Sequence, residues 1–233
     1  MLESADRADS NSAVRKDVWV QVPPAVPDPL DHDVSCRASP PDVTACIDDL
    51  GRGRPYPYLL GLYLGDGMLS LAHRGVWRLR ITLDARYPGI VARAQASIGE
   101  VAARTAGTIV RPGCIEVYSD WKHWPCAFPQ HGAGRKHERP ITLERWQIRL
   151  VAAHPGPFLA GLIHSDGCRF INRVASYAYP RYMFSNESAD IRDLFSWACA
   201  LEGIACRPAG RRNISVARRE AVAAMDRLVG PKV

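Results

Sequence analysis

A chain of 233 residues with 47% hydrophobic and 23% charged residues has the composition of an ordinary globular protein, large enough for one sizeable core or two small ones. No apolar run approaches the roughly 20 residues of a membrane-spanning helix, and the N-terminus shows no signal-peptide pattern. These features exclude a membrane protein and predict a cytoplasmic one. Seven scattered cysteines without a CxxC pair predict reduced thiols rather than a disulfide framework.

The net charge of +6 is unevenly distributed. Residues 1–54 carry 6 Lys or Arg against 10 Asp or Glu, whereas residues 55–233 carry 24 against 14, and nearly all of these cations are arginines. Arginine favours bidentate contacts with phosphate and with guanine edges. A GC-rich genome would also favour arginine, but either origin leaves a surface that suits a polyanion.

Residues 1–54 are rich in proline and in acidic residues and show no sustained helical or strand period. We therefore expect a largely disordered segment, with at most a short helix near residues 43–50. Residues 51–55, with two glycines and a proline, are typical of a flexible lead-in to a folded region.

In the next part of the chain, a helix is predicted from Pro57 to about Leu64 or Asp66, because prolines suit a first helical turn and Gly65 and Gly67 disfavour continuation. The patterns that follow predict a hairpin over 68–71 and 76–83, a helix over 88–105, a hairpin over 108–111 and 114–119, and a short aromatic helix over 120–128.

The second half repeats this order of elements. The predicted elements are a helix over 156–165, strands over 168–174 and 179–185, a helix over 188–201 with Ser188 as N-cap, strands over 205–207 and 213–217, and a helix over 218–229. The sequence therefore predicts an α+β fold of pseudo-symmetric tandem αββαββα repeats with two antiparallel sheets. The repeats span 55–129 and 155–233, and a linker over 130–154 holds one helix near 143–153.

Each repeat begins with a similar nonapeptide. Residues 59–67 read LLGLYLGDG and residues 159–167 read LAGLIHSDG, so Leu, Gly, Leu, Asp and Gly recur at the same five places without a gap. A single apolar helix that ends in Asp-Gly is more often followed by an ordinary turn than by a ligand site. Two copies in register, each followed by the same elements, favour a shared functional role for the two aspartates.

The duplicated nonapeptide resembles the motif of the LAGLIDADG (DOD-type) homing endonucleases, in their two-motif monomeric form. The second copy departs from the name motif only at His164 and Ser165. The resemblance covers about residues 55–230 and leaves the first 54 unexplained. It implies close packing of two motif helices through Gly61, Leu62, Gly161 and Leu162.

The resemblance further implies a sequence-specific endonuclease that cuts double-stranded DNA with Mg²⁺ or Mn²⁺. Two helices side by side about a pseudo-twofold axis would bring Asp66 and Asp166 together, where their carboxylates can hold divalent cations against the phosphates of both strands. Leu64 and His164 stand at the motif's other, variable acidic position. Lys122 is a candidate for a basic residue near the cleavage centre.

Members of that family lay two curved antiparallel sheets into the major groove, which implies DNA contacts from the strands that follow each motif. Arg78 and Arg80 alternate with Trp77 and Leu79, so the two arginines should share one face. We favour groove or phosphate contacts over plain solvated charge for seven arginines on or beside predicted strands: Arg78, Arg80, Arg111, Arg169, Arg173, Arg181 and Arg207.

Four potential zinc ligands precede or open the linker: His123, Cys126, His131 and His137. Their spacing matches no common structural zinc pattern. We therefore favour histidines that contact phosphate or pack on Trp121 and Trp124.

Two alternatives have the same fold. A DNA-binding transcriptional regulator would bind without cutting, but such regulators usually carry a helix-turn-helix module, which this sequence does not offer, and need not retain both acids. An RNA intron maturase would use the basic surface without the acids. The sequence has no intein splicing residues at its ends, which favours a free-standing protein or a remnant of something longer.

Overall fold

The computed structural model describes residues 55–230 and 232. The acidic segment 1–54, with its expected disorder and short helix, lies outside the described residues. None of the helices within 55–230 is long and apolar enough to cross a membrane.

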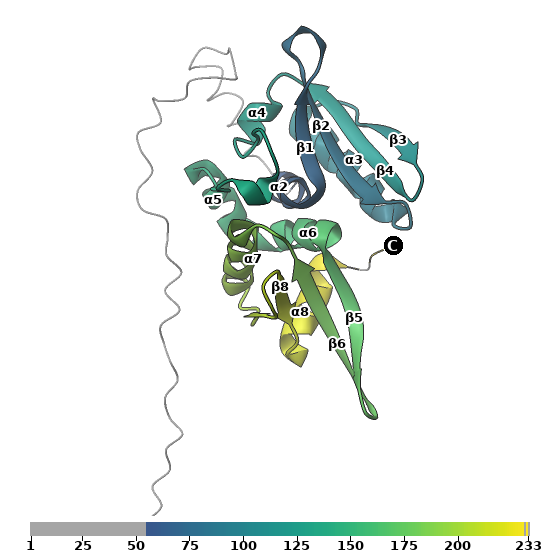
Figure 1. The fold of residues 1–233 in the computed structure, drawn as a ribbon, viewed down its shortest axis with the longest axis vertical. Helices are drawn as coiled ribbons and strands as arrows, with labels where there is room; N and C mark the ends of the chain where they lie inside the picture. Colours follow the sequence, from purple (N-terminus) through teal and green to yellow (C-terminus); the bar gives the residue numbers. More distant parts are fainter. Residues whose placement is uncertain (1–54, 231, 233) are drawn as a thin grey trace, which may run out of the picture. The chain divides into compact units, whose positions relative to one another are not determined.

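The first repeat places one helix before a four-stranded sheet (Figure 1). Its elements are α2 (Pro55–Asp66), β1 (Gly67–Leu71), the 3₁₀ turn η1 (His73–Gly75), β2 (Trp77–Asp84), α3 (Pro88–Ala102), β3 (Gly107–Arg111), β4 (Cys114–Trp121) and α4 (Trp124–Ala127). The strands are antiparallel, in the spatial order β1-β2-β4-β3.

The second repeat has the same order after a linker that contains η2 (Lys136–Glu138) and α5 (Arg145–Ala153). Its elements are α6 (Pro155–Asp166), β5 (Gly167–Val174), β6 (Tyr177–Ser185), α7 (Ala189–Leu201), β7 (Arg207–Pro208), β8 (Asn213–Val216) and α8 (Arg219–Val229). The strand order β5-β6-β8-β7 matches that of the first sheet. The predicted α+β fold of two pseudo-symmetric repeats with two antiparallel sheets is confirmed.

Several predicted elements differ from the structure in length or position, among them the aromatic helix and the strand before β8. The aromatic helix expected over 120–128 is reduced to Trp124–Ala127, because β4 continues to Trp121, which pairs with Trp77 of β2. The strand expected over 205–207 is displaced to Arg207–Pro208, which pair with Ser215 and Ile214 of β8. The predicted N-cap is confirmed, since the Ser188 hydroxyl accepts a hydrogen bond from the Ile191 amide at the start of α7.

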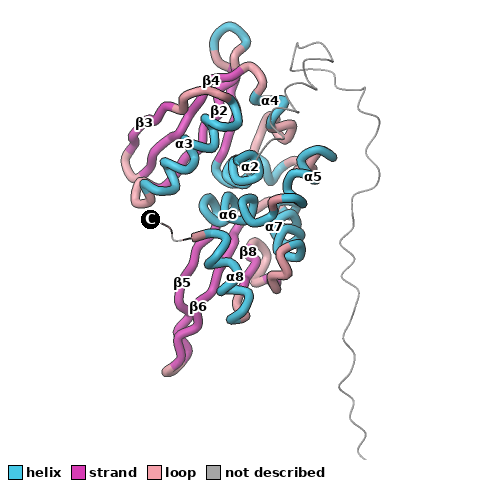
Figure 2. Tube along the Cα trace, turned by 180° about the vertical axis from the view of Figure 1, so that it is seen from behind, coloured by secondary structure: helices cyan, strands magenta, loops and turns pink. Residues whose placement is uncertain are grey.

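The motif helices α2 and α6 lie side by side between the two sheets (Figures 1 and 2). Both are apolar on all sides, because each is covered by its partner, by its own sheet and by neighbouring helices. Leu62 and Leu162 are fully buried. A Cβ atom on Gly61 would lie 2.5 Å from the Phe158 carbonyl oxygen, and one on Gly161 would collide with the Tyr58 carbonyl oxygen. The expected glycine-mediated interface is therefore a backbone-to-backbone contact.

Helices cover one face of each sheet. In the first sheet Leu79, Ile81 and Val117 point into the core, and in the second Tyr182 and Phe184 do so, with Phe184 stacked on Phe195 of α7 at 4.5 Å between ring centroids. No described helix covers the opposite, outer faces (Figures 1 and 2). The outer face of the first sheet carries Arg78 and Arg80, as the alternation predicts.

A buried polar network holds the linker against the first repeat. The Tyr56 hydroxyl donates to the Ala127 carbonyl oxygen at 2.6 Å and accepts from Gln147 of α5 at 2.7 Å. Gln147 and Gln130 exchange two further hydrogen bonds, of 2.6 and 3.1 Å. All these polar groups are satisfied within the network, which fixes both flanks of the segment that carries η2.

The helix crossing predicts a position-specific cost for one methyl group. We expect Gly161→Ala to lower the free energy of unfolding by about 1–3 kcal/mol, because the added carbon overlaps the opposing backbone and the helices must separate. Gly99→Ala in α3 is the matched control, since its nearest neighbour would be at an ordinary 3.7 Å. That variant should be neutral or slightly stabilised. Equal urea midpoints for the two variants would contradict the close crossing.

Candidate functional site

Each motif helix ends at its aspartate, and a strand begins at the next residue. Gly67 and Gly167 pack closely against the last turn of their helices. A Cβ on Gly67 would lie 2.5 Å from Tyr63 Cα, and one on Gly167 would lie 2.6 Å from the Ile163 side chain, so only glycine fits at each position. The ends of the two helices also meet: a Cβ on Gly65 would lie 3.0 Å from Asp166 Oδ2. The fold therefore brings the two aspartates together.

The pKa values of both carboxyl groups are raised. Desolvation of the Asp66 carboxyl group by the surrounding protein, followed by repulsion from Asp166, raises its pKa from 3.8 to about 6. The Asp66 side chain still reaches solvent, so water screens part of this repulsion. Asp166 is half-buried, and burial raises its pKa too, against a hydrogen bond from Asn186. Two acids that resist joint ionisation form a site that favours a cation.

Lys136 supplies one positive charge at this place. From η2 in the linker, its ammonium group donates hydrogen bonds to the carbonyl oxygens of Tyr63 and Gly65, the latter at 3.1 Å, and lies 4.8 Å from the Tyr63 ring centroid. Burial lowers the pKa of Lys136 to about 8, while attraction from Asp166 and Asp66 acts in the opposite direction. The charge sits at the C-terminal end of α2, which favours cations.

Lys232, beyond α8, approaches the end of the other motif helix. Its ammonium group donates a hydrogen bond of 2.5 Å to the Gly167 carbonyl oxygen and lies 5.6 Å from the Tyr87 ring centroid. Burial lowers the pKa of Lys232, and the nearby Cys168, Asp66 and Asp166 raise it. Each motif helix thus has one lysine at its C-terminal end.

Asn186 orients one of the acids. Its Nδ2 donates to Asp166 Oδ2 at 2.6 Å, while its Oδ1 accepts from the Ser188 amide at 2.8 Å. Because Ser188 caps α7, the amide group of Asn186 is anchored at both ends. The Asp166 carboxylate is therefore held in one orientation before any ligand arrives.

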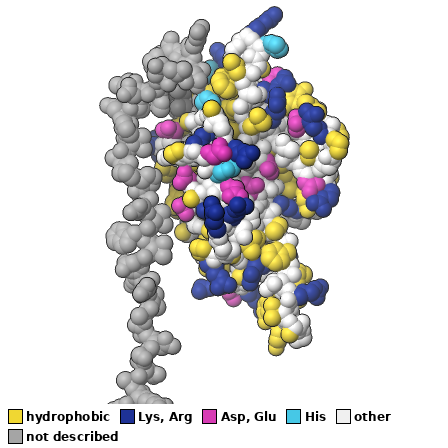
Figure 3. Space-filling view, viewed as in Figure 1, with side chains coloured by type: hydrophobic (Ala, Val, Ile, Leu, Met, Phe, Trp, Pro, Cys, Tyr) yellow, Lys and Arg dark blue, Asp and Glu magenta, His cyan; other side chains and the backbone are white. Residues whose placement is uncertain are grey.

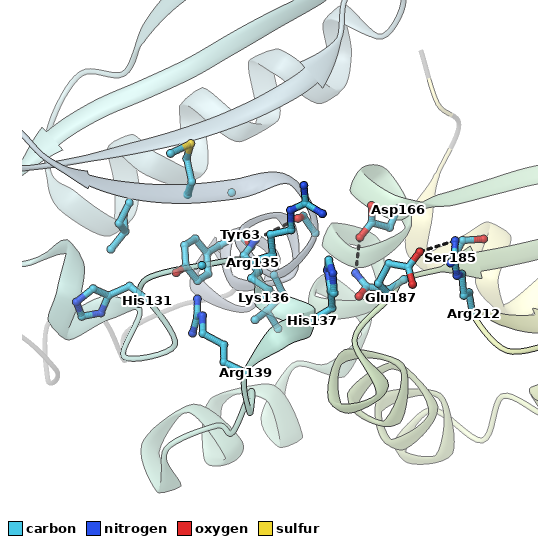
Figure 4. Close-up of a pocket in the computed structure, with 18 of the residues that line it drawn as sticks. Tyr63, His131, Arg135, Lys136, His137, Arg139, Asp166, Ser185, Glu187 and Arg212 are labelled. Atoms are coloured by element: carbon cyan, nitrogen blue, oxygen red, sulfur yellow. Dashed lines mark hydrogen bonds and ion pairs between the residues drawn. The ribbon is translucent and has the colours of Figure 1, made fainter.

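A cavity of about 650 Å³ opens beside these groups, between the end of α2, the linker and the ends of β6 and β8 (Figure 4). Asp166, Asn186, Lys136 and Arg139 are among its lining residues, whereas Asp66 is not. Arg212 pairs with Glu187 at the rim, at 2.5 Å. The cavity combines carboxylate oxygens with cationic donors, which suits an anion held through a metal.

The sequence matches no family model and no curated protein. Solved structures share its fold. A mesophilic variant of the homing endonuclease I-DmoI is 13% identical with a TM-score of 0.50, over 78% of this chain and 98% of that one. A further I-DmoI variant, solved with its target DNA and in the presence of Mn, is 13% identical with a TM-score of 0.51, over 78% and 96%.

This chain has the LAGLIDADG homing endonuclease fold. The N-terminal LAGLIDADG domain of DUF199/WhiA is also similar, at 12% identity and a TM-score of 0.47, over 82% of this chain and 91% of that one. At these identities the likeness describes the fold alone.

The residues at the variable motif position have packing roles in this LAGLIDADG fold. Leu64 is fully buried. His164 is buried and shares a hydrogen bond of 2.9 Å between its Nδ1 and the Tyr58 hydroxyl. Burial lowers the pKa of His164 to about 4, so it is neutral at physiological pH.

The donor set fits a hard divalent cation. Asp66 and Asp166 offer carboxylate oxygens, and their mutual repulsion is a force that a cation would relieve. Within residues 55–230 and 232, no three His, Cys, Asp or Glu side chains are grouped as a ready-made metal cage.

Two of the three histidines considered for zinc pack against aromatic rings. His123 lies edge-on to Trp121, with ring centroids 5.3 Å apart, as one of the sequence-based interpretations expects. His131 lies edge-on to Trp77 at 5.1 Å and also lines the cavity.

The seven predicted DNA-contacting arginines occupy three kinds of place. Arg78, Arg80 and Arg111 lie on the outer face of the first sheet, where Arg78 pairs with Asp120 and Arg111 with Glu116. The other four belong to the second sheet. Arg181 and Arg207 alternate with core-facing residues and therefore lie on its outer face. Arg169 lies on the helix-facing side, where it pairs with Asp226 of α8, and the exposed Arg173 lies on the same side further along the hairpin.

Three residues near the acids were not found from the sequence: Lys136, Lys232 and Asn186. Lys122, the basic candidate chosen from the sequence, is exposed just after β4 and does not line the cavity. One sequence signal was available, because residues 55–233 contain only three lysines among many arginines, and two of the three lie at the site. Asn186 carries no comparable signal.

The raised pKa of Asp66 predicts a pH dependence without divalent metal. Between about pH 4 and 6 the folded chain holds a proton that the unfolded chain has released, so the free energy of unfolding should fall as pH rises through this window. After solvent screening we expect a change on the order of 1 kcal/mol. Asp66→Asn should remove this part of the slope in urea titrations at each pH, and the exposed control Asp193→Asn should not.

Proposed function

We propose that this chain is a sequence-specific DNA endonuclease that hydrolyses both strands of a duplex with a divalent metal, Mg²⁺ or Mn²⁺. The observation that carries the proposal is the meeting of Asp66 and Asp166 at the ends of two crossed helices, with one lysine beside each helix end. The chain supplies both motifs, so one molecule completes the site. We therefore propose a monomer with repeats at 55–129 and 155–233, and separately we propose a cytoplasmic location.

In this proposal Asp66 and Asp166 hold the metal, which when bound polarises the scissile phosphate and lowers the pKa of a water molecule. Asn186 keeps the Asp166 carboxylate in its binding orientation. Lys136, whose pKa is lowered to about 8, keeps its Nζ proton at neutral pH and can donate a hydrogen bond to a phosphate or leaving oxygen. Lys232 offers a second donor at the end of α6.

The open outer faces of the sheets are the proposed DNA-binding surface. Both begin directly after the aspartates, so a duplex along them passes over the cavity. Basic, acidic and hydrophobic side chains are interspersed on the face seen in Figure 3, and basic and hydrophobic ones line the projecting β5–β6 hairpin. An I-DmoI variant, which shares the fold, was solved with its target DNA and in the presence of Mn, which supports DNA as partner and a divalent metal as cofactor.

Cleavage tests the proposal directly. Incubation with a randomised duplex library and Mg²⁺, followed by sequencing of the ends, should yield cuts at one site family. Asp66→Asn and Asp166→Asn should abolish double-strand cutting while retaining the same binding preference. Asp193→Asn, an exposed carboxylate change of the same chemistry, should cut normally. Sequence-specific binding with no cutting by the native chain would instead indicate a regulator, and preferential binding of structured RNA a maturase.

Metal binding can be tested without activity. Mg²⁺ should raise the melting temperature of the native chain, because the cation relieves the repulsion between the two acids in the folded state only. Both Asp66→Asn and Asp166→Asn should lose most of this shift. Retention of the full shift in both variants would show that the cation binds elsewhere.

Variants of two lysines supply a further test of the proposal. We expect Lys136→Met to slow cleavage by about 100-fold with DNA binding little changed, as for loss of one donor aimed at developing charge. Lys122→Met, an identical change at the residue chosen from the sequence, should have a much smaller effect, because Lys122 is exposed just after β4 and is not among the charges that act on Asp66 or Asp166. Single-turnover rates with saturating enzyme make the comparison, and the opposite ranking would restore Lys122 as the catalytic candidate.

A further inference from the structure

One arginine on the outer face of the first sheet is held in an unusually defined position. Arg78 of β2 lies directly opposite Asp120 of β4 in the sheet register. The Arg78 Nε donates to Asp120 Oδ1 at 2.7 Å, and Nη2 donates to Oδ2 at 2.6 Å. Two parallel charge-assisted bonds fix the plane of the guanidinium group.

A ring restrains the same group. The Arg78 Cζ lies 4.8 Å from the ring centroid of Tyr118, its diagonal neighbour on β4. The Tyr118 ring packs against Gly107 of β3, where a Cβ would lie 2.6 Å from a ring carbon. Glycine at this position therefore lets the tyrosine lie across the sheet, and the tyrosine supports the arginine.

The side-on carboxylate leaves part of the guanidinium group free. Of its five N–H donors, Asp120 takes the one on Nε and one on Nη2, so both donors on Nη1 and the second on Nη2 remain. These form the end-on fork that matches the O6 and N7 acceptors of guanine in the major groove. The Arg78 side chain is 31% exposed, so this fork is accessible.

The charges of the pair argue against a phosphate as its ligand. Asp120 neutralises the charge of Arg78 and would itself repel a phosphate. The N–H donors of the fork stay free, because Asp120 accepts from Nε and from one N–H of Nη2 only. A cross-strand ion pair that served only to stabilise the sheet would not require an accessible fork or a supporting ring.

We propose that Arg78 recognises a guanine in the half of the DNA target bound by the first repeat, with Asp120 as its positioning residue. The inference rests on the proposed DNA-binding function and names the base that one side chain selects. The second repeat contains an ion pair of the same geometry, in which Arg169 donates side-on to Asp226 at 2.7 and 3.0 Å. That pair lies on the helix-facing side of its sheet, where the Tyr182 hydroxyl donates to the same carboxylate.

Binding selection from randomised duplexes, without added divalent metal so that no strand is cut, tests the proposal. The native chain should select guanine at one position that loses its preference in Arg78→Lys, because lysine keeps the charge but not the fork. Asp120→Asn should weaken the same preference and no other. The exposed control Asp193→Asn on α7 should leave every base preference intact, and melting temperatures confirm that each variant folds.

A modified base separates base recognition from a structural role. Placing 7-deazaguanine at the selected position removes the N7 acceptor and should weaken binding of the native chain by about tenfold, with little effect on Arg78→Lys. A selected site whose preferences do not change in either Arg78→Lys or Asp120→Asn overturns the inference and leaves the proposed function standing. A native chain that selects no site overturns both.

Discussion

The close crossing of α2 and α6 is the constraint on which the rest of the structure depends. Gly61 and Gly161 let the two backbones touch, and each glycine stands five residues before its aspartate. An α-helix advances about 1.5 Å and turns about 100° per residue, so equal spacing gives both aspartates the same height and rotation relative to the crossing. A one-residue insertion in either motif would rotate one carboxylate away. The gapless register of the two nonapeptides is therefore a geometric requirement of the site.

The same crossing concentrates negative charge. Two helix C-termini, with their partly negative carbonyl groups, end beside two carboxylates. Lys136 and Lys232 offset part of this charge by donating to the terminal carbonyl oxygens, while burial and then repulsion from Asp166 still raise the pKa of Asp66. We expect a further cation to stabilise a site with this balance. The packing of the helix crossing therefore holds two acids close together against their electrostatic repulsion.

The sequence contained most of the fold because its periods are local. Alternation, prolines, glycines and the Ser188 cap located the helices and strands to within a few residues, and the in-register repeat gave the symmetry. The site was predictable only where symmetry repeats it, at Asp66 and Asp166. Asn186 reaches the acids from the end of a strand, Lys136 from the linker and Lys232 from the segment after α8. These contacts depend on how the segments pack. Such contacts between residues distant in sequence leave no periodic pattern.

Duplication of the fold does not make the two outer surfaces alike. The first sheet carries arginines paired with carboxylates, Arg78 with Asp120 and Arg111 with Glu116, so its outer face offers directed donors with little net charge. The second continues into a two-stranded hairpin with exposed apolar and aromatic side chains, among them Tyr177 and Tyr179, stacked at 5.8 Å. Directed donors distinguish guanine, whereas apolar groups contact thymine methyl groups. A duplex bound along both surfaces would meet different chemistry in each half, so a symmetric fold is compatible with an asymmetric target sequence.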